Sequence, residues 1–356
     1  MKKFFLPIAF SLGSILLSAQ SYYYAEPQGY GAETTGGGNA TPIIVEDYQS
    51  LKEHLSSEGS KVILVSGEIK FAPGDRIRAI VKDKTLIGLP GAKFTAEEQS
   101  ADGSGILALR EGSKNVIIRN LTFVGPGAWD INGQDNLTIE GAKNVWIDHC
   151  DFQDGQDGNL DFRGNTDNIT VSWTKFSYLK PPKAGGVGGA DDHRFSNLVG
   201  ANAKDAPEDG HFSITWQNVY WGEGTKERMP RARNAQLHIL NSYWQTSVSG
   251  SRAIGLGGGI NNSFVYVQNS HFTRVDRILS TYKSDGGATF ITFDGTINGE
   301  ANIGMVPTPR YSATIMPAKD VRRFLTDKTC GAGATLDVSI SGEIKPMKCT
   351  NTKITK

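Results

Sequence analysis

The stretch VWIDHCDF at residues 145–152 is one copy of a phrase that runs through most of the 356-residue chain. Each copy is a short strand pattern, then a polar residue that is usually asparagine, and then an aromatic residue three positions later. The other copies are VIIRNLTF at 116–123, ITVSWTKF at 169–176, FSITWQNVYW at 212–221, LHILNSYW at 237–244 and VYVQNSHF at 265–272. This recurrence indicates a repeat architecture.

The spacing of the closing aromatic residues identifies the kind of repeat. They follow one another at 23 to 29 residues, except between Phe176 and Trp221, where the gap is about two repeats and 197–200 (NLVG) supplies the missing strand. Leucine-rich repeats have this length, but their leucine-asparagine pattern is absent from the sequence. The helical ankyrin and tetratricopeptide repeats are longer, at about 33 to 34 residues. We therefore expect an all-β parallel β-helix with projecting loops, whose N-terminal end is covered by a short helix starting at Asp47.

The overall composition excludes some functions. Lys and Arg number 37 and so do Asp and Glu, so the formal net charge is zero. A globally basic nucleic-acid-binding protein is therefore excluded. The 42 glycines suit a protein with many turns.

The first residues are expected to be removed from the mature protein. Lys2 and Lys3 precede an apolar run and then small residues, a pattern typical of a secretory signal peptide over 1–19. A single domain would then occupy 20–356, without a membrane span, secreted to the periplasm or the medium. Cys330 and Cys349 could pair there, whereas Cys150 is expected to be a buried thiol.

Two clusters of charged residues could carry chemistry. Carboxylates gather between 151 and 167, among them Asp157 and Asp161, and Asp135 lies one coil earlier. Such an oxygen-rich cluster suits Ca²⁺, although a solvated acidic turn would look the same. Arginines gather at 228–233 (RMPRAR), and arginine suits capture of carboxylates. We therefore expect an anionic ligand held by both a metal ion and arginines.

Several motifs resemble those of the pectate lyase family 1 superfamily. They are the run from 145 to 176 with its Asp157-Gly-Asn-Leu-Asp161, the R-x-P-x-x-R motif from Arg228 to Arg233, Gly29-Tyr-Gly near the start, and segments up to 333 near the end. The resemblance implies a right-handed parallel β-helix that cleaves α-1,4-polygalacturonate by Ca²⁺-assisted β-elimination, acts as a monomer and binds pectin.

The resemblance also implies roles for single residues. Ca²⁺ would be held by Asp135, Asp157 and Asp161, with Asp130 a candidate to replace a family aspartate that is Gly133 here. Arg228 would be the catalytic base, and Arg233 and Arg163 would bind substrate carboxylates. The family's lysine position falls on Phe195, so the adjacent Arg194 is the candidate substitute.

Three alternatives remain open at this level. A pectin lyase acting on the methyl ester would also depart from the pectate pattern at Phe195. A polygalacturonase-like hydrolase could use carboxylates such as Asp167 and Asp192, and a β-helix could bind polysaccharide without catalysis. His149 is expected to stack as a structural residue, and Trp173, Trp221 and Trp244 are expected in the core.

Overall fold

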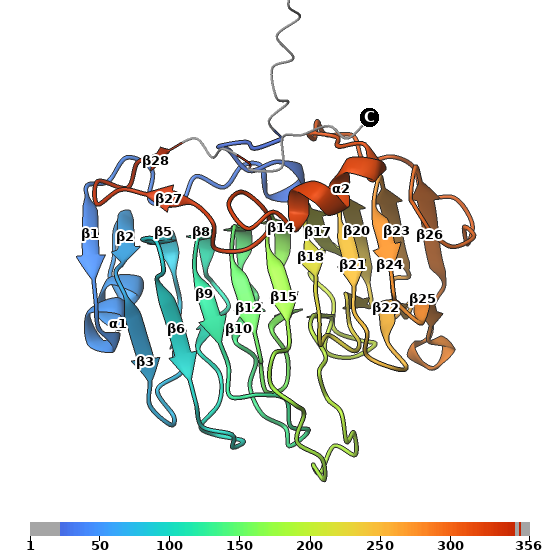
Figure 1. Ribbon diagram of the computed structural model, residues 1–356, viewed down its shortest axis with the longest axis horizontal. Coiled ribbons are helices and arrows are strands. Elements are labelled where there is room, and N and C mark those ends of the chain that lie inside the picture. Colours follow the sequence, from blue (N-terminus) through green and yellow to red (C-terminus); the bar gives the residue numbers. More distant parts are fainter. Residues whose placement is uncertain (1–21, 346–348, 350–356) are drawn as a thin grey trace, which may run out of the picture.

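The computed structural model describes residues 22–345 and residue 349. The predicted signal peptide at 1–19 lies outside the described residues. The rest winds into a parallel β-solenoid (Figure 1), which confirms the predicted parallel β-helix. Each coil contributes one strand to each of three long sheets, and all neighbouring strands in these sheets pair in parallel.

The three sheets are called A, B and C. In spatial order sheet A contains β1 (Pro42–Val45), β2 (Lys61–Val65), β5 (Lys82–Gly88), β8 (Lys114–Arg119), β11 (Lys143–Asp148), β14 (Asp167–Ser172), β17 (Phe212–Gln217), β20 (Ala235–Leu240), β23 (Ser263–Gln268) and β26 (Thr289–Asp294). Sheet B contains β3 (Glu68–Phe71), β6 (Lys93–Ala96), β9 (Thr122–Val124), β12 (Asp151–Gln153), β15 (Lys175–Ser177), β18 (Tyr220–Trp221), β21 (Tyr243–Gln245) and β24 (His271–Thr273). Sheet C contains β4 (Ile77–Ala79), β7 (Leu107–Leu109), β10 (Leu137–Glu140), β13 (Leu160–Arg163), β16 (Leu198–Val199), β19 (Arg231–Ala232), β22 (Arg252–Leu256) and β25 (Arg277–Thr281). The strand predicted at 197–200 is β16.

The aromatic residues that close the repeated phrase form one stack through the core. They are register partners in sheet B, namely Phe123, Phe152, Phe176, Trp221, Trp244 and Phe272. Each is at most 1% exposed, and neighbouring ring centroids lie between 4.2 and 6.1 Å apart. Offset or stacked rings at this spacing add to the free energy gained by burying their area. Trp221 and Trp244 therefore lie in the core as predicted.

The polar residue of each phrase turns the chain from sheet A to sheet B. The six corner residues all have φ between 45° and 58°, and they are Asn120, His149, Trp173, Asn218, Asn241 and Asn269. This left-handed conformation favours asparagine over other residues with a Cβ atom. The buried His149 ring stacks on Trp173 with centroids 5.6 Å apart, as expected for a structural histidine.

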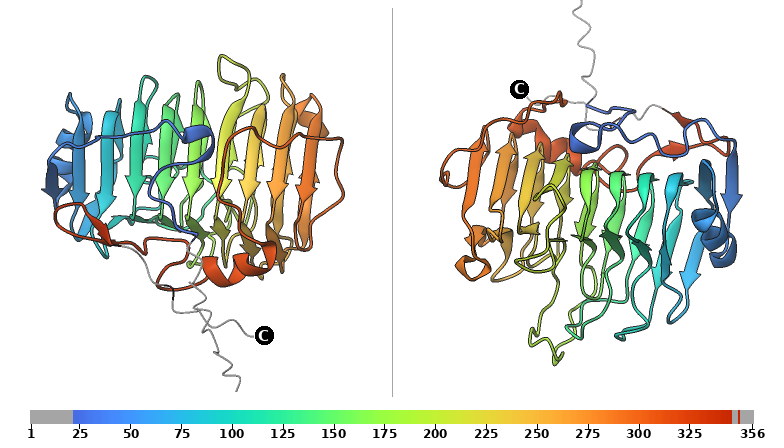
Figure 2. Two further views of the ribbon diagram at one scale, coloured as in Figure 1. Left: turned by 90° about the horizontal axis from the view of Figure 1, so that it is seen from above. Right: turned by 180° about the vertical axis from the view of Figure 1, so that it is seen from behind.

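Two terminal segments lie across the outer face of sheet A (Figure 2). The N-terminal strap, residues 29–38, includes the 3-10 helix η1 (Gly29–Gly31) and donates backbone N–H groups to threonine hydroxyls of the sheet. The C-terminal strap, residues 305–316, brings the Tyr311 hydroxyl to 2.7 Å from Thr215 Oγ1 and from His238 Nδ1. Both straps thus find hydrogen-bond partners on that face.

Each of the two α-helices packs against an apolar part of the solenoid. Helix α1 (Tyr48–Ser56) begins where predicted, because the Asp47 carboxylate accepts a hydrogen bond from Ser50 N, and it buries Leu51 and Leu55 in the main core. Helix α2 (Ala318–Leu325) packs on a second apolar cluster that includes Trp173. The remaining elements are η2 (Lys283–Asp285) and the antiparallel pair β27 (Asp337–Val338) and β28 (Ile344–Lys345).

The cysteines behave as predicted. Cys330 and Cys349 form a disulfide with Cα atoms 5.1 Å apart, and Cys150 is a buried free thiol whose pKa is raised by burial. Among the described helices none is long and apolar enough to cross a membrane.

Candidate active site

The predicted site residues gather along sheet C, where chain segments arrive from sheet B. Asp135 precedes β10, Asp157 precedes β13 and Asp161 lies in β13. Strands β10 and β13 pair directly, with Thr138 opposite Asp161. Neighbouring coils therefore bring the three carboxylates together, as the sequence suggested.

The carboxylates of Asp135 and Asp161 point at one spot, the backbone of Gly158. A Cβ atom at Gly158 would lie 2.9 Å from Asp135 Oδ1 and 3.1 Å from Asp161 Oδ1. Burial and then the neighbouring Asp135 charge raise the pKa of Asp161 well above its usual range. Burial and then the Asp157 charge raise the pKa of Asp135. Crowded carboxylates of this kind need a compensating positive charge to remain ionised together.

This donor set fits a hard cation. Asp135 Oδ2 accepts a hydrogen bond from Thr138 at 2.6 Å, but its buried Oδ1 has no hydrogen-bond partner in the described part of the chain. Asp161 Oδ1 accepts from Leu198 N at 2.9 Å and is thereby oriented. Oxygen atoms from three carboxylates, one of them unsatisfied, match the preference of Ca²⁺ for oxygen ligands.

Arg228 lies on the loop that precedes β19, and its positive charge acts on the acidic cluster. Its positive charge lowers the pKa of Asp161, opposing the effects of burial and Asp135. Its backbone has φ of 58°, a conformation that costs an arginine roughly 1–3 kcal/mol. Its carbonyl accepts a hydrogen bond from Asn197 N at 2.7 Å, which helps to hold that conformation. Backbone strain of this kind clusters at functional sites.

The predicted carboxylate-binding arginines lie further along the outer face of sheet C. Arg163 pairs with Glu140 at 3.3 Å, at the edge of an open cleft of about 620 Å³. Arg233 pairs with Asp285 at 3.1 Å and donates a hydrogen bond to the Gly200 carbonyl at 2.8 Å. Each guanidinium keeps further N–H groups with which a second carboxylate could be bound.

Phe195, rather than Arg194, lies against Arg228. The Arg228 guanidinium carbon is 4.9 Å from the centroid of the Phe195 ring, within the range of a cation–π contact. Arg194 instead donates two hydrogen bonds of 2.7 Å to the Asp192 carboxylate. The structure therefore leaves an apolar ring at the position where the resemblance places a lysine.

Sequence reasoning missed three residues of this region, namely Asp285, Tyr282 and His193. Asp285 holds Arg231 as well as Arg233, and the Tyr282 ring lies 3.5 Å below the Arg231 guanidinium. His193 lies beside Asp157 and beside Asp130, the residue that the sequence offered as a further calcium ligand. No periodic signal marks these residues, because they lie in loops or at strand ends that are far apart in the sequence.

Comparison with known proteins places the chain in a family. The family model described as pectate lyase matches residues 2–333. The probable pectate lyase B of Aspergillus flavus is 33% identical over 296 residues, which cover 80% of this chain and 78% of that protein. The pectate trisaccharide-lyase of Thermotoga maritima is 32% identical over 229 residues, or 61% of this chain, and the match spans only 56% of that protein.

A solved structure shows the same fold. It is a pectate lyase from Bacillus sp. N165 in complex with trigalacturonate, with a TM-score of 0.66 and 21% identity, over 87% of this chain and 99% of that chain. The resemblance drawn from the motifs is thus confirmed by comparisons that cover most of the sequence. The chain belongs to the pectate lyase family.

Proposed function

We propose that the protein is a pectate lyase that cleaves α-1,4-polygalacturonate by Ca²⁺-assisted β-elimination and releases 4,5-unsaturated oligogalacturonides. One observation carries this proposal: three crowded carboxylates lie beside Arg228, which acts electrostatically on one of them. Family membership supports the reaction class, and the relative solved with trigalacturonate supports the substrate class.

The arginines of sheet C would bind and orient the polymer. A polygalacturonate chain presents one carboxylate per sugar, so Arg163 and Arg233, which follow each other along the sheet, could each take one. Arginine binds a carboxylate with two parallel N–H···O bonds, which fixes its orientation as well as its position. The ion pairs to Glu140 and Asp285 hold both guanidinium groups in place beforehand.

Arg228 would move the proton. The C5 hydrogen lies next to the C6 carboxylate, so its removal gives an enolate-like anion. A neutral guanidine nitrogen of Arg228 takes this proton, the C4–C5 double bond forms, and the bond from C4 to the glycosidic oxygen breaks. The leaving oxygen then takes a proton from solvent water, and the Arg228 guanidinium returns its proton to the hydroxide that remains. Since free arginine is neutral only above about pH 12, the rate should rise with pH in the alkaline range.

Asp135, Asp157 and Asp161 would hold the Ca²⁺. When bound, the ion supplies positive charge that neutralises the substrate carboxylate and so makes the C5 hydrogen more acidic. The unsatisfied Asp135 oxygen and the crowding of the three carboxylates support this assignment.

The cellular setting is part of the same proposal. A signal peptide at 1–19 and the disulfide between Cys330 and Cys349 support secretion to an oxidising compartment. There the protein would act on pectic polysaccharide as a monomer, as a single domain over 20–356.

Phe195 favours a second candidate, a pectin lyase. An apolar ring beside Arg228 would suit the neutral methyl ester of the substrate better than a lysine would. Such an enzyme would depend little on Ca²⁺, because its substrate carries few charges there.

One assay separates these functions. Initial rates are measured on unesterified and on highly methylated polymer, each with Ca²⁺ and with chelator, by the ultraviolet absorbance of the unsaturated product. We expect faster cleavage of the unesterified polymer, and loss of activity with chelator. Chelator-resistant cleavage of the methylated polymer would identify a pectin lyase. New reducing ends without ultraviolet absorbance would identify a hydrolase. If neither signal appears, the protein binds the polysaccharide without cleaving it.

A further inference from the structure

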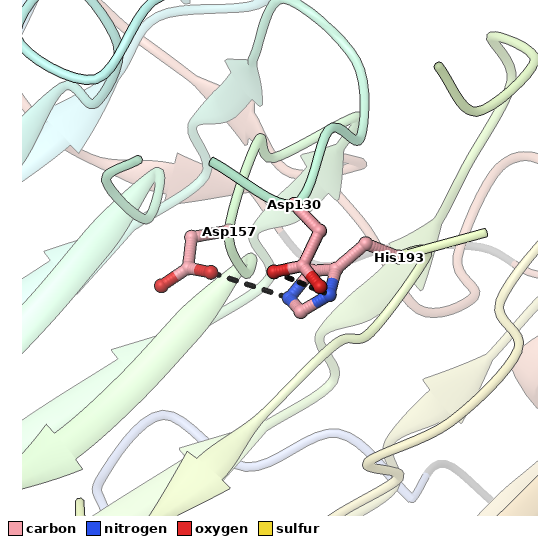
Figure 3. Close-up of side chains that lie close together, drawn as sticks. All are labelled: Asp130, Asp157 and His193. Atoms are coloured by element: carbon pink, nitrogen blue, oxygen red, sulfur yellow. Dashed lines mark ion pairs between the residues drawn. The ribbon is translucent and has the colours of Figure 1, made fainter. Parts of the chain in front are cut away.

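A buried histidine contacts two carboxylates at the edge of the acidic cluster (Figure 3). Asp130, Asp157 and His193 lie on the loops that lead from sheet B to sheet C in three successive coils. His193 Nδ1 is 3.3 Å from Asp130 Oδ1, and its Nε2 is 3.2 Å from Asp157 Oδ1. One donor atom from each residue lies within 4.8 Å of the other two.

The ring nitrogens of His193 are left unsatisfied by these contacts. The residue is only 4% exposed, and within residues 22–345 neither nitrogen has a hydrogen bond of acceptable geometry. Leaving a buried polar group unsatisfied destabilises the folded protein. A cation bound to Nε2 would satisfy that nitrogen together with the carboxylates, and the proton would then stay on Nδ1, which faces Asp130.

The surrounding loop holds Asp130 in position. Its Oδ2 accepts a hydrogen bond from Ala190 N at 2.8 Å, and its carbonyl accepts one from Gly188 N at 2.9 Å. A Cβ atom at Gly188 would lie only 2.1 Å from Asp130 Oδ1, so this close approach needs glycine. Such outer contacts orient metal ligands and are a usual part of a metal site.

The donor set differs from that of a calcium site. Imidazole nitrogen suits borderline transition metals, whereas Ca²⁺ takes oxygen. Tetrahedral Zn²⁺ with bonds near 2.0–2.1 Å separates its ligand atoms by about 3.3 Å, which matches the 3.2 Å between His193 Nε2 and Asp157 Oδ1. A donor atom of Asp130 lies within 4.8 Å of the other two, which brings the number of candidate protein ligands to three.

We propose that Asp130, Asp157 and His193 form a second cation site, which binds a divalent transition metal such as Zn²⁺ or Co²⁺. The site shares Asp157 with the proposed Ca²⁺ ligands, and it assigns Asp130 to a partnership with His193 instead of to the calcium site. A transition metal bound here would withdraw Asp157 from the calcium site, so the two ions should compete.

The test uses the protein without a histidine tag, stripped of metal. Co²⁺ alone is added and its visible absorption recorded, and Zn²⁺ alone is titrated by calorimetry. We expect about one equivalent of either ion to bind, with a Co²⁺ spectrum indicating nitrogen and oxygen ligands. His193→Gln and Asp130→Asn should each weaken binding at least tenfold, and His211→Gln and Asp102→Asn should not.

Further measurements keep the outcomes distinct. Asp135→Asn should retain the Co²⁺ spectrum while weakening Ca²⁺ binding, and Zn²⁺ should raise the apparent Ca²⁺ dissociation constant of the unaltered protein. If His193→Gln fails to fold by circular dichroism, Asp130→Asn carries the test. Absent binding, or binding that both variants retain, would overturn the second site. Because these readouts do not involve turnover, such a failure would leave the proposed reaction untouched.

Discussion

Sheets A and C are wound from the same coils, yet their outer faces differ in chemistry. The outer face of sheet A carries mostly uncharged polar residues such as Thr85, Thr170 and Thr215, and the two straps cover it. Its buried charges, Arg119 and Asp148, neutralise each other in an ion pair of 2.6 Å. The outer face of sheet C carries Asp161 in β13 and Arg231 in β19, and no strap crosses this part of the sheet in the described structure.

This difference shows how one repeat can serve two purposes. A strap can close a face only if its backbone groups find partners there, and hydroxyl groups supply them without leaving an unpaired charge buried. Charged residues on the other face are paired or crowded together, as Arg231 is with Asp285 and Asp135 is with Asp161, and a charged ligand or ion can complete them. The same coil therefore stabilises the fold on one side and offers a binding surface on the other.

The largest expected effect concerns the outer face of sheet C, called the open face below. Arg228→Lys should lower the β-elimination rate by about 10²–10⁴-fold, because lysine places its single nitrogen differently from the guanidinium that takes the proton. The unfolding temperature should change little. Arg274→Lys is the matched control, since Arg274 is exposed and also has a positive φ, of 55°. Equal turnover of the Arg228 variant and the unaltered protein would remove Arg228 from the mechanism.

On the covered face, the outer face of sheet A, we expect substitutions to change the free energy of unfolding instead of the turnover. Gly29→Ala would place a Cβ atom 2.3 Å from Thr215 Oγ1, at φ of 81°, so we expect about 3 kcal/mol loss of unfolding free energy. Gly38→Ala is the control: its φ is 56°, but nothing lies within 4 Å of the added atom, so about 1 kcal/mol is expected. Denaturant unfolding measures both. Turnover per folded molecule should be unchanged, and equal losses in the two variants would show that the clash does not matter.

The covered face should also give a pH dependence. Burial lowers the pKa of His238 to about 4 from 6.5, so the folded state binds fewer protons than the unfolded chain between these values. The stability from neutral His238 is therefore complete above pH 6.5 and lost as the pH falls toward 4, by about 1.4 kcal/mol per unit.

His238→Gln tests this dependence. Glutamine could replace the contacts of His238 to Tyr311 and Gln268 but cannot become charged. The unfolding free energy of the variant should fall by about 2 kcal/mol less between pH 6.5 and pH 5 than that of the unaltered protein. Parallel curves would mean that His238 does not take up a proton on unfolding in this range.

The smallest expected effect is on ion binding at the open face. Asp161→Asn should weaken Ca²⁺ binding about tenfold, or about 1.4 kcal/mol, because a neutral amide replaces a charged ligand. Calorimetric titration of Ca²⁺ measures this, with the exposed Asp102→Asn as the control. Superimposable titrations would leave Asp161 only the role of a strand residue that accepts a hydrogen bond from Leu198 N.

The periodic part of the molecule could be predicted from the sequence. Phe152 and Asn241 each occupy a position that every coil repeats, and equivalent positions must stack when coils stack. Helix α1 could also be predicted, because its N-cap and its apolar spacing are local.

The loops could not be predicted in the same way. His193 reaches Asp157, and Asp285 reaches Arg233, only because loops of unequal length fold back on the solenoid. Neither contact has a period or a fixed spacing in the sequence. Likewise, Arg194 is adjacent to Phe195 in the sequence. Only the structure shows that its guanidinium donates two hydrogen bonds to the Asp192 carboxylate.

The continuous stack of aromatic rings also makes the solenoid modular. Each coil contacts mainly its neighbours, and the rings of Trp244 and Phe272 stack at 4.2 Å, while Trp244 Nε1 also donates a hydrogen bond to the Met229 carbonyl at 2.8 Å. A duplicated coil spliced in between β23 and β26 would lengthen the protein by about 4.8 Å and keep the spacing of the acidic and basic residues on β10 to β19. Gene duplication could therefore extend the binding surface without redesigning the chemistry.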